Sequence, residues 1–167
     1  MKFTQKDFDE TTELAALIGK IDNMDAEYVN TVTDDIFIKQ PFFLSVLLGY
    51  RLDVLPIELE EIMRIYFLIW EYFKSNPNVQ TRMVKQAYFE KIQLRNIQML
   101  KYCEGEPSQH DKLKVFSHDL QKLQSKSLLA AVLFRFDNRL VLSKMDGEKK
   151  GFVLIGIKSF IECFETI

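Results

Sequence analysis

The histidines of this chain are too widely spaced for the usual helical metal site. His110 and His118 are eight residues apart, which places them about 80° apart around an ideal helix. A helical metal site of the Glu-x-x-His type needs a carboxylate three residues before each histidine, and Pro107 and Val115 occupy those positions. The sequence therefore predicts that the protein holds no metal and no cofactor.

Nucleophilic and phosphate-binding residues also lack a supporting motif. Cys103 is expected near a helix C-terminus, where the dipole opposes thiolate formation, and Cys163 lies among phenylalanines. Ser45 lies within an apolar run, where a hydroxyl normally bonds back to its own helix. The segment from Gly151 to Ser159 is one residue too long for a P-loop and has a bulky apolar filler. An enzymatic function is therefore not favoured.

Four residues are the candidate contacts for a ligand or partner: Tyr50, Arg51, Asp53 and Trp70. Polar residues between two apolar helices can line a cleft, but they more often cap helix ends. In that case Arg51 would serve the end of one helix and Asp53 the start of the next. Trp70 is expected in the core, at the edge of an apolar arc from which it can also face a groove. A cleft near residues 50–70 is thus one hypothesis for the site.

The elements that position these residues are predicted to be helices. Thr4 and Asp25 stand at N-cap positions, Pro41 and Pro56 stand at first-turn positions, and apolar residues recur at helical spacing between them. The helices expected from these signals cover residues 4–22, 25–39, 41–50, 57–74, 79–103, 113–124 and 127–136. The long helix at 79–103 carries two apolar lines and is expected to pack on two sides.

The C-terminal segment admits two interpretations. Asp137-Asn138 and Asp146-Gly147 are turn dipeptides beside short apolar runs, which favours a β-hairpin near residues 139–157. Val153, Ile157, Phe160, Ile161 and Phe164 nevertheless recur at helical spacing, and this favours a helix. We therefore predict an all-α fold, a single domain over residues 1–167 with about six to seven helices, and the hairpin is the alternative ending.

Composition and charge limit the function further. The 167 residues are 47% hydrophobic and 28% charged with a net charge of −2, which indicates a folded domain. Residues 1–83 carry 8 Lys/Arg and 14 Asp/Glu, and residues 84–167 carry 14 and 10, so the halves should attract each other. The basic residues form no stripe, so we expect no nucleic-acid partner. Without an export signal or a long apolar run, we expect a cytoplasmic protein with no membrane partner.

These observations favour a noncatalytic protein-interaction module. Apolar side chains continue to the last residues, Phe160 to Ile167, and they must be covered. We expect the chain's own core to cover them first, and a homodimer through this C-terminal segment is the other candidate. The alternative function is a small-molecule sensor or enzyme that uses the cleft near residues 50–70.

Overall fold

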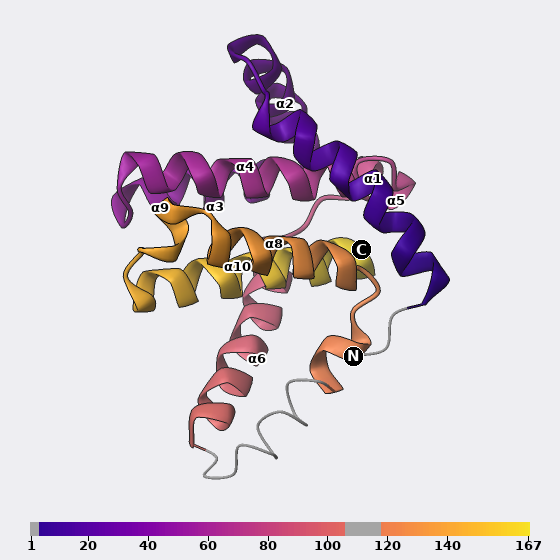
Figure 1. The fold of residues 1–167 in the computed structure, drawn as a ribbon. Helices are drawn as coiled ribbons and strands as arrows, with labels where there is room; N and C mark the ends of the chain where they lie inside the picture. The colour runs from indigo at the N-terminus through magenta and orange to yellow at the C-terminus, as the bar shows by residue number, and fades with distance from the viewer. Residues whose placement is uncertain (1–3, 106–117) are drawn as a thin grey trace.

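The computed structural model describes residues 4–105 and 118–167, and this part of the chain is helical without a strand (Figure 1). The all-α prediction is confirmed, although the helices are more numerous than the expected six to seven. They are α1 (Gln5–Asp22), α2 (Ala26–Lys39), α3 (Pro41–Gly49), the 3-10 helix η1 (Tyr50–Leu52), α4 (Pro56–Phe73), α5 (Pro77–Thr81), α6 (Gln86–Gly105), α8 (Lys126–Asn138), α9 (Leu140–Ser143) and α10 (Gly147–Thr166). Residues 118–122 are also helical. None of the described helices is both long and apolar enough to cross a membrane.

The predicted starts of three helices are confirmed by their caps. The Thr4 side chain accepts a hydrogen bond from the backbone N–H of Asp7, and the Asp7 carboxylate accepts one from the Thr4 backbone, so α1 begins with a capping box. Asp25 caps α2 with a single hydrogen bond, which its side chain accepts from the backbone N–H of Tyr28 at 2.8 Å. At α4, Pro56 occupies the first turn, and the Glu58 carboxylate accepts a hydrogen bond from the backbone N–H of Leu55 at 2.8 Å.

An aromatic core lies between α3, α4, the start of α6 and α10. The centroid of the Phe160 ring lies 4.2 Å from that of Phe89 and 4.8 Å from that of Phe43. The Phe43 ring stacks on the Tyr66 ring with a centroid distance of 4.7 Å. Trp70 has no exposed surface, which confirms its expected place in the core. Phe160, Ile161 and Phe164 are also fully buried, so the chain's own core covers the apolar C-terminal segment.

The hairpin alternative for residues 139–157 is wrong, because this segment forms α9 and the first half of α10. Asp146, which was read as a turn residue, is the N-cap of α10: its side chain accepts a hydrogen bond from the backbone N–H of Lys149 at 3.1 Å. Gly156 weakens the helix, but it makes room for a neighbour. A Cβ at this position would lie 2.5 Å from the hydroxyl oxygen of Tyr50. The glycine is therefore explained by close packing rather than by a turn.

The predicted helix at 79–103 is wrong in its extent, because residues 82–85 separate α5 from α6. The buried side chain of Gln40 explains the break. Its Nε2 donates to the carbonyl oxygens of Val79 and Arg82, both at 2.7 Å, and its Oε1 accepts from the backbone N–H of Val84 at 2.9 Å. Three backbone groups thus find partners outside a helix, which removes the main penalty for interrupting it.

The acidic N-terminal half and the basic C-terminal half are joined by ion pairs. The Asp22 carboxylate forms ion pairs with Nη2 of Arg135 at 2.8 Å and with Nη2 of Arg139 at 2.7 Å. Burial opposes ionisation of Asp22, but the hydrogen bond and the charge of Arg135 outweigh it and hold the pKa of Asp22 below its usual value. Glu61 lies 3.5 Å from the same Arg135 nitrogen, so α1, α4 and α8 meet at one arginine.

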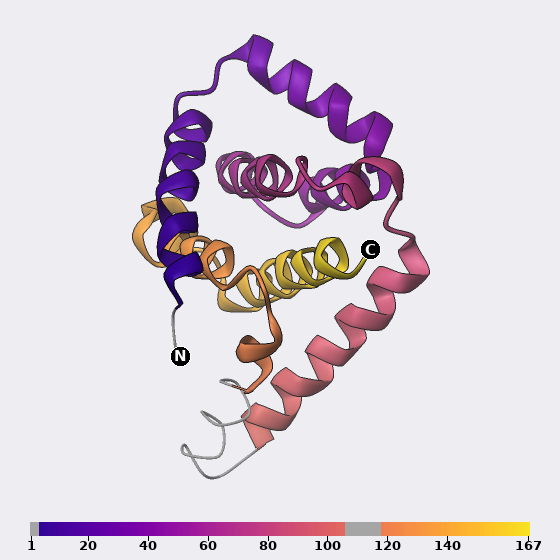
Figure 2. The ribbon, with the colours of Figure 1, turned by 90° about the vertical axis from the view of Figure 1, so that its right-hand side faces the viewer.

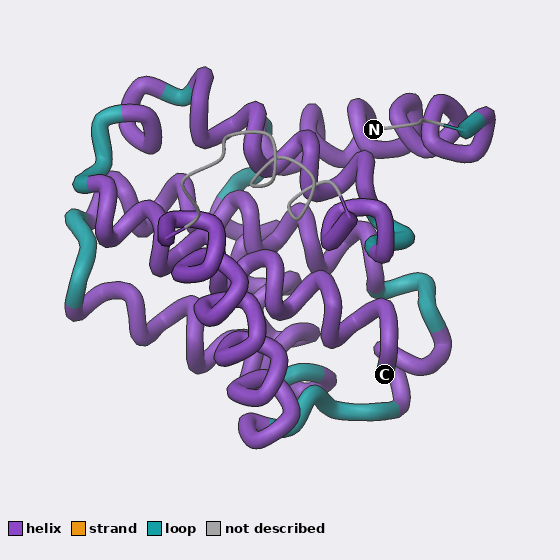
Figure 3. The backbone as a smooth tube through the Cα atoms, turned by 90° about the horizontal axis from the view of Figure 1, so that it is seen from below, coloured by secondary structure: helices purple, strands orange, loops and turns teal. Residues whose placement is uncertain are grey.

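Helix α6 packs mainly on α10. It contacts α10 from Tyr88 to Asn96 and then diverges from the layer that contains α8 and α10 (Figures 1 and 2). Only Phe89, Ile92 and Asn96 of its residues are buried. The expectation that this helix packs on two sides is therefore wrong, and Leu94 is 55% exposed on the second apolar line. Seen from below, the described backbone consists of helices joined by short connections (Figure 3).

Candidate functional site

The structure does not bring the four candidate residues together. Tyr50 is buried, and its hydroxyl lies 2.9 Å from the hydroxyl of Tyr66. Burial raises the pKa of Tyr50 to about 12. Trp70 lies elsewhere in the core and donates its indole N–H to the Asp35 carboxylate at 3.0 Å. These two aromatic residues are both buried and have separate polar partners.

Arg51 and Asp53 lie in and just after η1, and both are exposed. Within the described residues, neither side chain forms a hydrogen bond or an ion pair, so their expected capping roles are wrong. Glu58 provides the side-chain hydrogen bond at the start of α4. Its position three residues after Leu55 is the sequence signal that identifies it.

The strongest candidate site is an apolar cavity of about 400 Å³ between helical segments far apart in the sequence, which we call the α6–α10 pocket. Its walls come from α6, from the helical residues 118–122, from α8 and from α10. On α6 and α10 the lining residues recur at helical spacing, so each helix turns one side toward the cavity. The lining residues are Asn96, Met99, Leu100, Cys103, Asp119, Leu120, Leu129, Leu133, Gly151, Leu154, Ile155 and Lys158.

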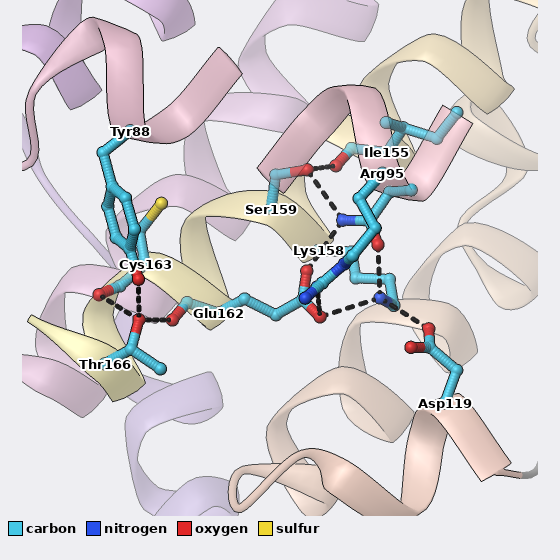
Figure 4. Close-up of polar contacts among 10 residues, drawn as sticks. Tyr88, Arg95, Asp119, Ile155, Lys158, Ser159, Glu162, Cys163 and Thr166 are labelled. Carbon is cyan, nitrogen blue, oxygen red and sulfur yellow. Dashed lines mark hydrogen bonds and ion pairs between the residues drawn. The ribbon is translucent and has the colours of Figure 1, made fainter. Parts of the chain in front are cut away.

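Three polar residues, Asn96, Asp119 and Lys158, line one part of the α6–α10 pocket and belong to a cluster of polar contacts around Lys158 (Figure 4). The ammonium nitrogen of Lys158 lies 2.8 Å from the Asp119 carboxylate, 3.1 Å from the Glu162 carboxylate and 2.8 Å from Oδ1 of Asn96. Nδ2 of Asn96 donates to Glu162 at 2.7 Å and to Ser159 Oγ at 3.0 Å. Nη2 of Arg95 reaches Glu162 at 2.6 Å.

Charges and hydrogen bonds within this polar cluster are balanced. Two carboxylates, Asp119 and Glu162, are matched by the cations of Lys158 and Arg95. An ammonium group has three N–H donors, and Lys158 has three acceptors in contact. The two N–H donors of the Asn96 amide have two acceptors. The cluster therefore needs no further ligand to satisfy these donors.

The described residues of the pocket show no arrangement for covalent chemistry. Cys103 lies on the α6 wall, and no histidine is among the described lining residues. The lining carboxylate of Asp119 is paired with Lys158 at 2.8 Å. The second cysteine, Cys163, is in the core, where burial raises the pKa of its thiol to about 12 and keeps it protonated. Ser45 donates its hydroxyl hydrogen to the carbonyl oxygen of Pro41 at 2.9 Å, which confirms the predicted bond back to its own helix.

Metal and phosphate sites find no support in the described part of the chain. No three histidine, cysteine, aspartate or glutamate side chains gather there in a way that could hold an ion. His118 is exposed, and His110 lies outside the described residues. The segment from Gly151 to Ser159 is continuous helix, so its similarity to a P-loop is accidental.

Two other cavities, each of about 560 Å³, have walls with more polar groups. One lies between α1, the end of α4 and Glu165, and it contains several glutamates. Of these, Glu71 is held by Lys74 at 2.7 Å and by the hydroxyl of Tyr28 at 2.8 Å. The other lies between α6 and the C-terminal end of α10. Neither shows the combination of an apolar interior and a fully paired polar end.

Sequence reasoning missed the α6–α10 pocket, although part of its signal is visible in the sequence. Asn96, Met99 and Cys103 follow one side of the predicted helix at 79–103. Periodicity alone cannot show that this side faces a cavity rather than filled core. Comparisons with known proteins found no matching family, no matching curated protein and no matching solved structure.

Proposed function

We propose that this protein is a noncatalytic binding protein and that the α6–α10 pocket holds a small apolar molecule. The observation that carries the proposal is the cavity of about 400 Å³ lined mainly by apolar side chains from four helical segments. Pockets for small molecules commonly measure about 300–1,000 Å³ and are often formed between helices. The site thus differs in place from the cleft near residues 50–70 expected from the sequence.

The size of the cavity suits a small molecule. Its volume of about 400 Å³ lies within the range of about 300–1,000 Å³ that is common for small-molecule pockets. A molecule with an apolar body of about ten to twenty heavy atoms fits this space.

The chemistry of the lining favours binding without catalysis. Its acidic and basic residues, Asp119 and Lys158, are already paired with each other at 2.8 Å. A general base must be able to reach the proton that it abstracts, and these groups are held in the polar cluster. Apolar contact is therefore what the remaining surface of the pocket offers a ligand.

A protein-interaction module, the function favoured by the sequence, is the second candidate. Its specific support is the exposure of large apolar side chains near the pocket-forming helices, with Phe134 of α8 at 66%, Leu140 of α9 at 66% and Phe152 of α10 at 51%. Partners commonly bind through exposed aromatic side chains. Burial of Phe160, Ile161 and Phe164 leaves those C-terminal side chains no surface for a second copy, so a partner would use other residues.

The proposal is tested with an uncharged fluorescent probe, N-phenyl-1-naphthylamine, whose emission rises in an apolar environment. Given the contribution of each ligand atom to affinity, we expect saturable binding with a Kd of about 100 μM or tighter. Leu100→Gln provides the test variant, because Leu100 is 44% exposed on α6 and lines the pocket. We expect binding to weaken about fivefold or more as apolar contact is lost.

Leu94→Gln is the matched control. Leu94 lies on the same helix and is 55% exposed, but it does not line the α6–α10 pocket. We expect probe binding to be unchanged in this variant. Absence of saturable binding to the original protein, or equal loss in both variants, would refute the pocket as a small-molecule site.

A further inference from the structure

The polar cluster at the end of the α6–α10 pocket restricts the ligands that the pocket can hold. We infer that the pocket is selective for uncharged apolar molecules, such as a long-chain alcohol, over the corresponding carboxylate or ammonium compound. The inference rests on the proposed function and specifies the ligand class of the same site. It follows from the way in which Lys158 is held by its neighbours.

A lysine at the end of an apolar cavity would ordinarily indicate a site for a fatty-acid carboxylate. Here the three donors of Lys158 already face Asp119 at 2.8 Å, Asn96 at 2.8 Å and Glu162 at 3.1 Å. The side chain of Lys158 is also only 16% exposed, so it has little room to turn toward another partner. A ligand carboxylate would have to displace one of these acceptors.

The charges around Lys158 add to this barrier. Asp119 lines the pocket, and Glu162 lies beside it in contact with the same Lys158. Both carboxylates are buried, and Arg95 and Lys158 already balance them. A ligand carboxylate would add a negative charge beside the two carboxylates without a free cation of the cluster to match it. Burying such an unmatched charge is costly, whereas an apolar chain or a hydroxyl carries no net charge.

A cationic ligand meets the reverse difficulty. The carboxylates that would attract an ammonium group are already bonded to Lys158 and Arg95. The ammonium group of the ligand would therefore have to displace that of Lys158, which is part of α10 and already lies in contact with these carboxylates. Selectivity against both signs of charge distinguishes this site from one that simply contains an acid or a base.

The test compares three ligands with the same ten-carbon chain: 1-decanol, decanoate and decylammonium. Each ligand is titrated to displace bound N-phenyl-1-naphthylamine from the protein at pH 8. 1-Decanol is kept below its solubility limit, and the two charged ligands are kept below their critical micelle concentrations. We expect both charged ligands to bind at least about tenfold more weakly than 1-decanol. A charged ligand that binds as tightly as 1-decanol would overturn the inference but leave the proposed function intact. Failure of the probe and of all three ligands to bind would reject both.

A single substitution sharpens the test. Asp119→Asn removes one negative charge and weakens one hold on Lys158, so the affinity for decanoate should rise about threefold or more relative to the affinity for 1-decanol. Asp137→Asn is the matched control, because Asp137 is exposed on α8 and does not line the pocket. An affinity for decanoate relative to 1-decanol that is the same in Asp119→Asn as in the original protein, with the variant folded, would contradict the role of the cluster.

Discussion

Helix α10 has two sides with different packing. On one side, Phe160 and Phe164 join the aromatic core with Phe43, at ring distances of 4.8 Å and 5.1 Å. On the other side, Leu154 and Ile155 line a cavity of about 400 Å³. Both sides are rich in apolar residues, yet one is filled by aromatic rings from other helices and the other is not.

One helix thus packs into the core on one side and lines a pocket on the other. Where α3 and α4 cross α10, large rings leave no room and the side chains are fully buried. The second half of α6 diverges from α10 (Figure 2), and residues of both helices line the pocket there. Substitutions on the filled side should therefore affect folding, and those on the pocket side should affect binding.

The largest expected difference comes from truncating one residue on each side. Phe160→Ala should lower the free energy of unfolding by about 3–5 kcal/mol, because it removes a fully buried ring and leaves a cavity. Leu154→Ala should cost less than about 1.5 kcal/mol, because Leu154 is only partly buried and already borders a cavity. Urea unfolding followed by Trp70 fluorescence measures both changes. Similar losses would show that the two sides are not packed differently.

A smaller effect is expected from filling the space at Gly156. A Cβ there would lie 2.5 Å from the Tyr50 hydroxyl oxygen, so Gly156→Ala should destabilise the protein by about 1–3 kcal/mol. In the Tyr50→Phe background the clash is absent, and the same substitution should be neutral or stabilising because alanine favours helix. A double-mutant cycle from thermal unfolding tests this coupling. Additive effects of the two substitutions would mean that Tyr50 does not restrict position 156.

The smallest expected effect is a pH dependence of stability that arises from Tyr50, a residue that does not line the pocket. Burial raises the pKa of Tyr50 to about 12 in the folded protein, whereas a tyrosine in the unfolded chain titrates near 10. The Tyr50 hydroxyl therefore stays protonated to higher pH in the folded state than in the unfolded state. Its contribution to the free energy of unfolding is complete below about pH 10 and is lost as the pH rises toward 12.

Between pH 8 and pH 11, Tyr50 should contribute a loss of about 1 kcal/mol in unfolding free energy. Tyr50→Phe should show a correspondingly shallower decline over this range, after allowance for its lower starting stability. Ligand binding at the α6–α10 pocket should not change in this variant, because Tyr50 does not line it. Identical pH dependence in the two proteins would contradict the buried state of the Tyr50 hydroxyl.

Helix positions were predictable where the signal is local. Thr4, Asp25 and Pro56 mark helix starts by interactions within one turn, and the structure confirms all three. The errors arose from contacts between distant residues. Gln40 interrupts the helix around residues 82–85, and Tyr50 accounts for Gly156. Neither contact produces a pattern in the neighbouring sequence.

The candidate site was less predictable than the fold for the same reason. Polar residues in a short connection suggested Arg51 and Asp53, but both are exposed without side-chain partners in the described residues. The pocket instead depends on the angle between α6 and α10 and on leucines that resemble ordinary core residues, such as Leu129 and Leu133. Periodicity identifies the apolar side of a helix, but it does not reveal whether another side chain fills the opposite space.

The central claim is that the pocket side of α10 binds an uncharged apolar ligand and the filled side does not. Methyl NMR spectra recorded during titration with 1-decanol test it most directly. We predict that shifts concentrate on pocket methyl groups, those of Leu100, Leu129, Leu133, Leu154 and Ile155, while those of the core residues Ile62, Ile65 and Ile69 stay in place. Absence of saturable shifts, or shifts centred on the core or on exposed side chains away from the pocket, would contradict the account.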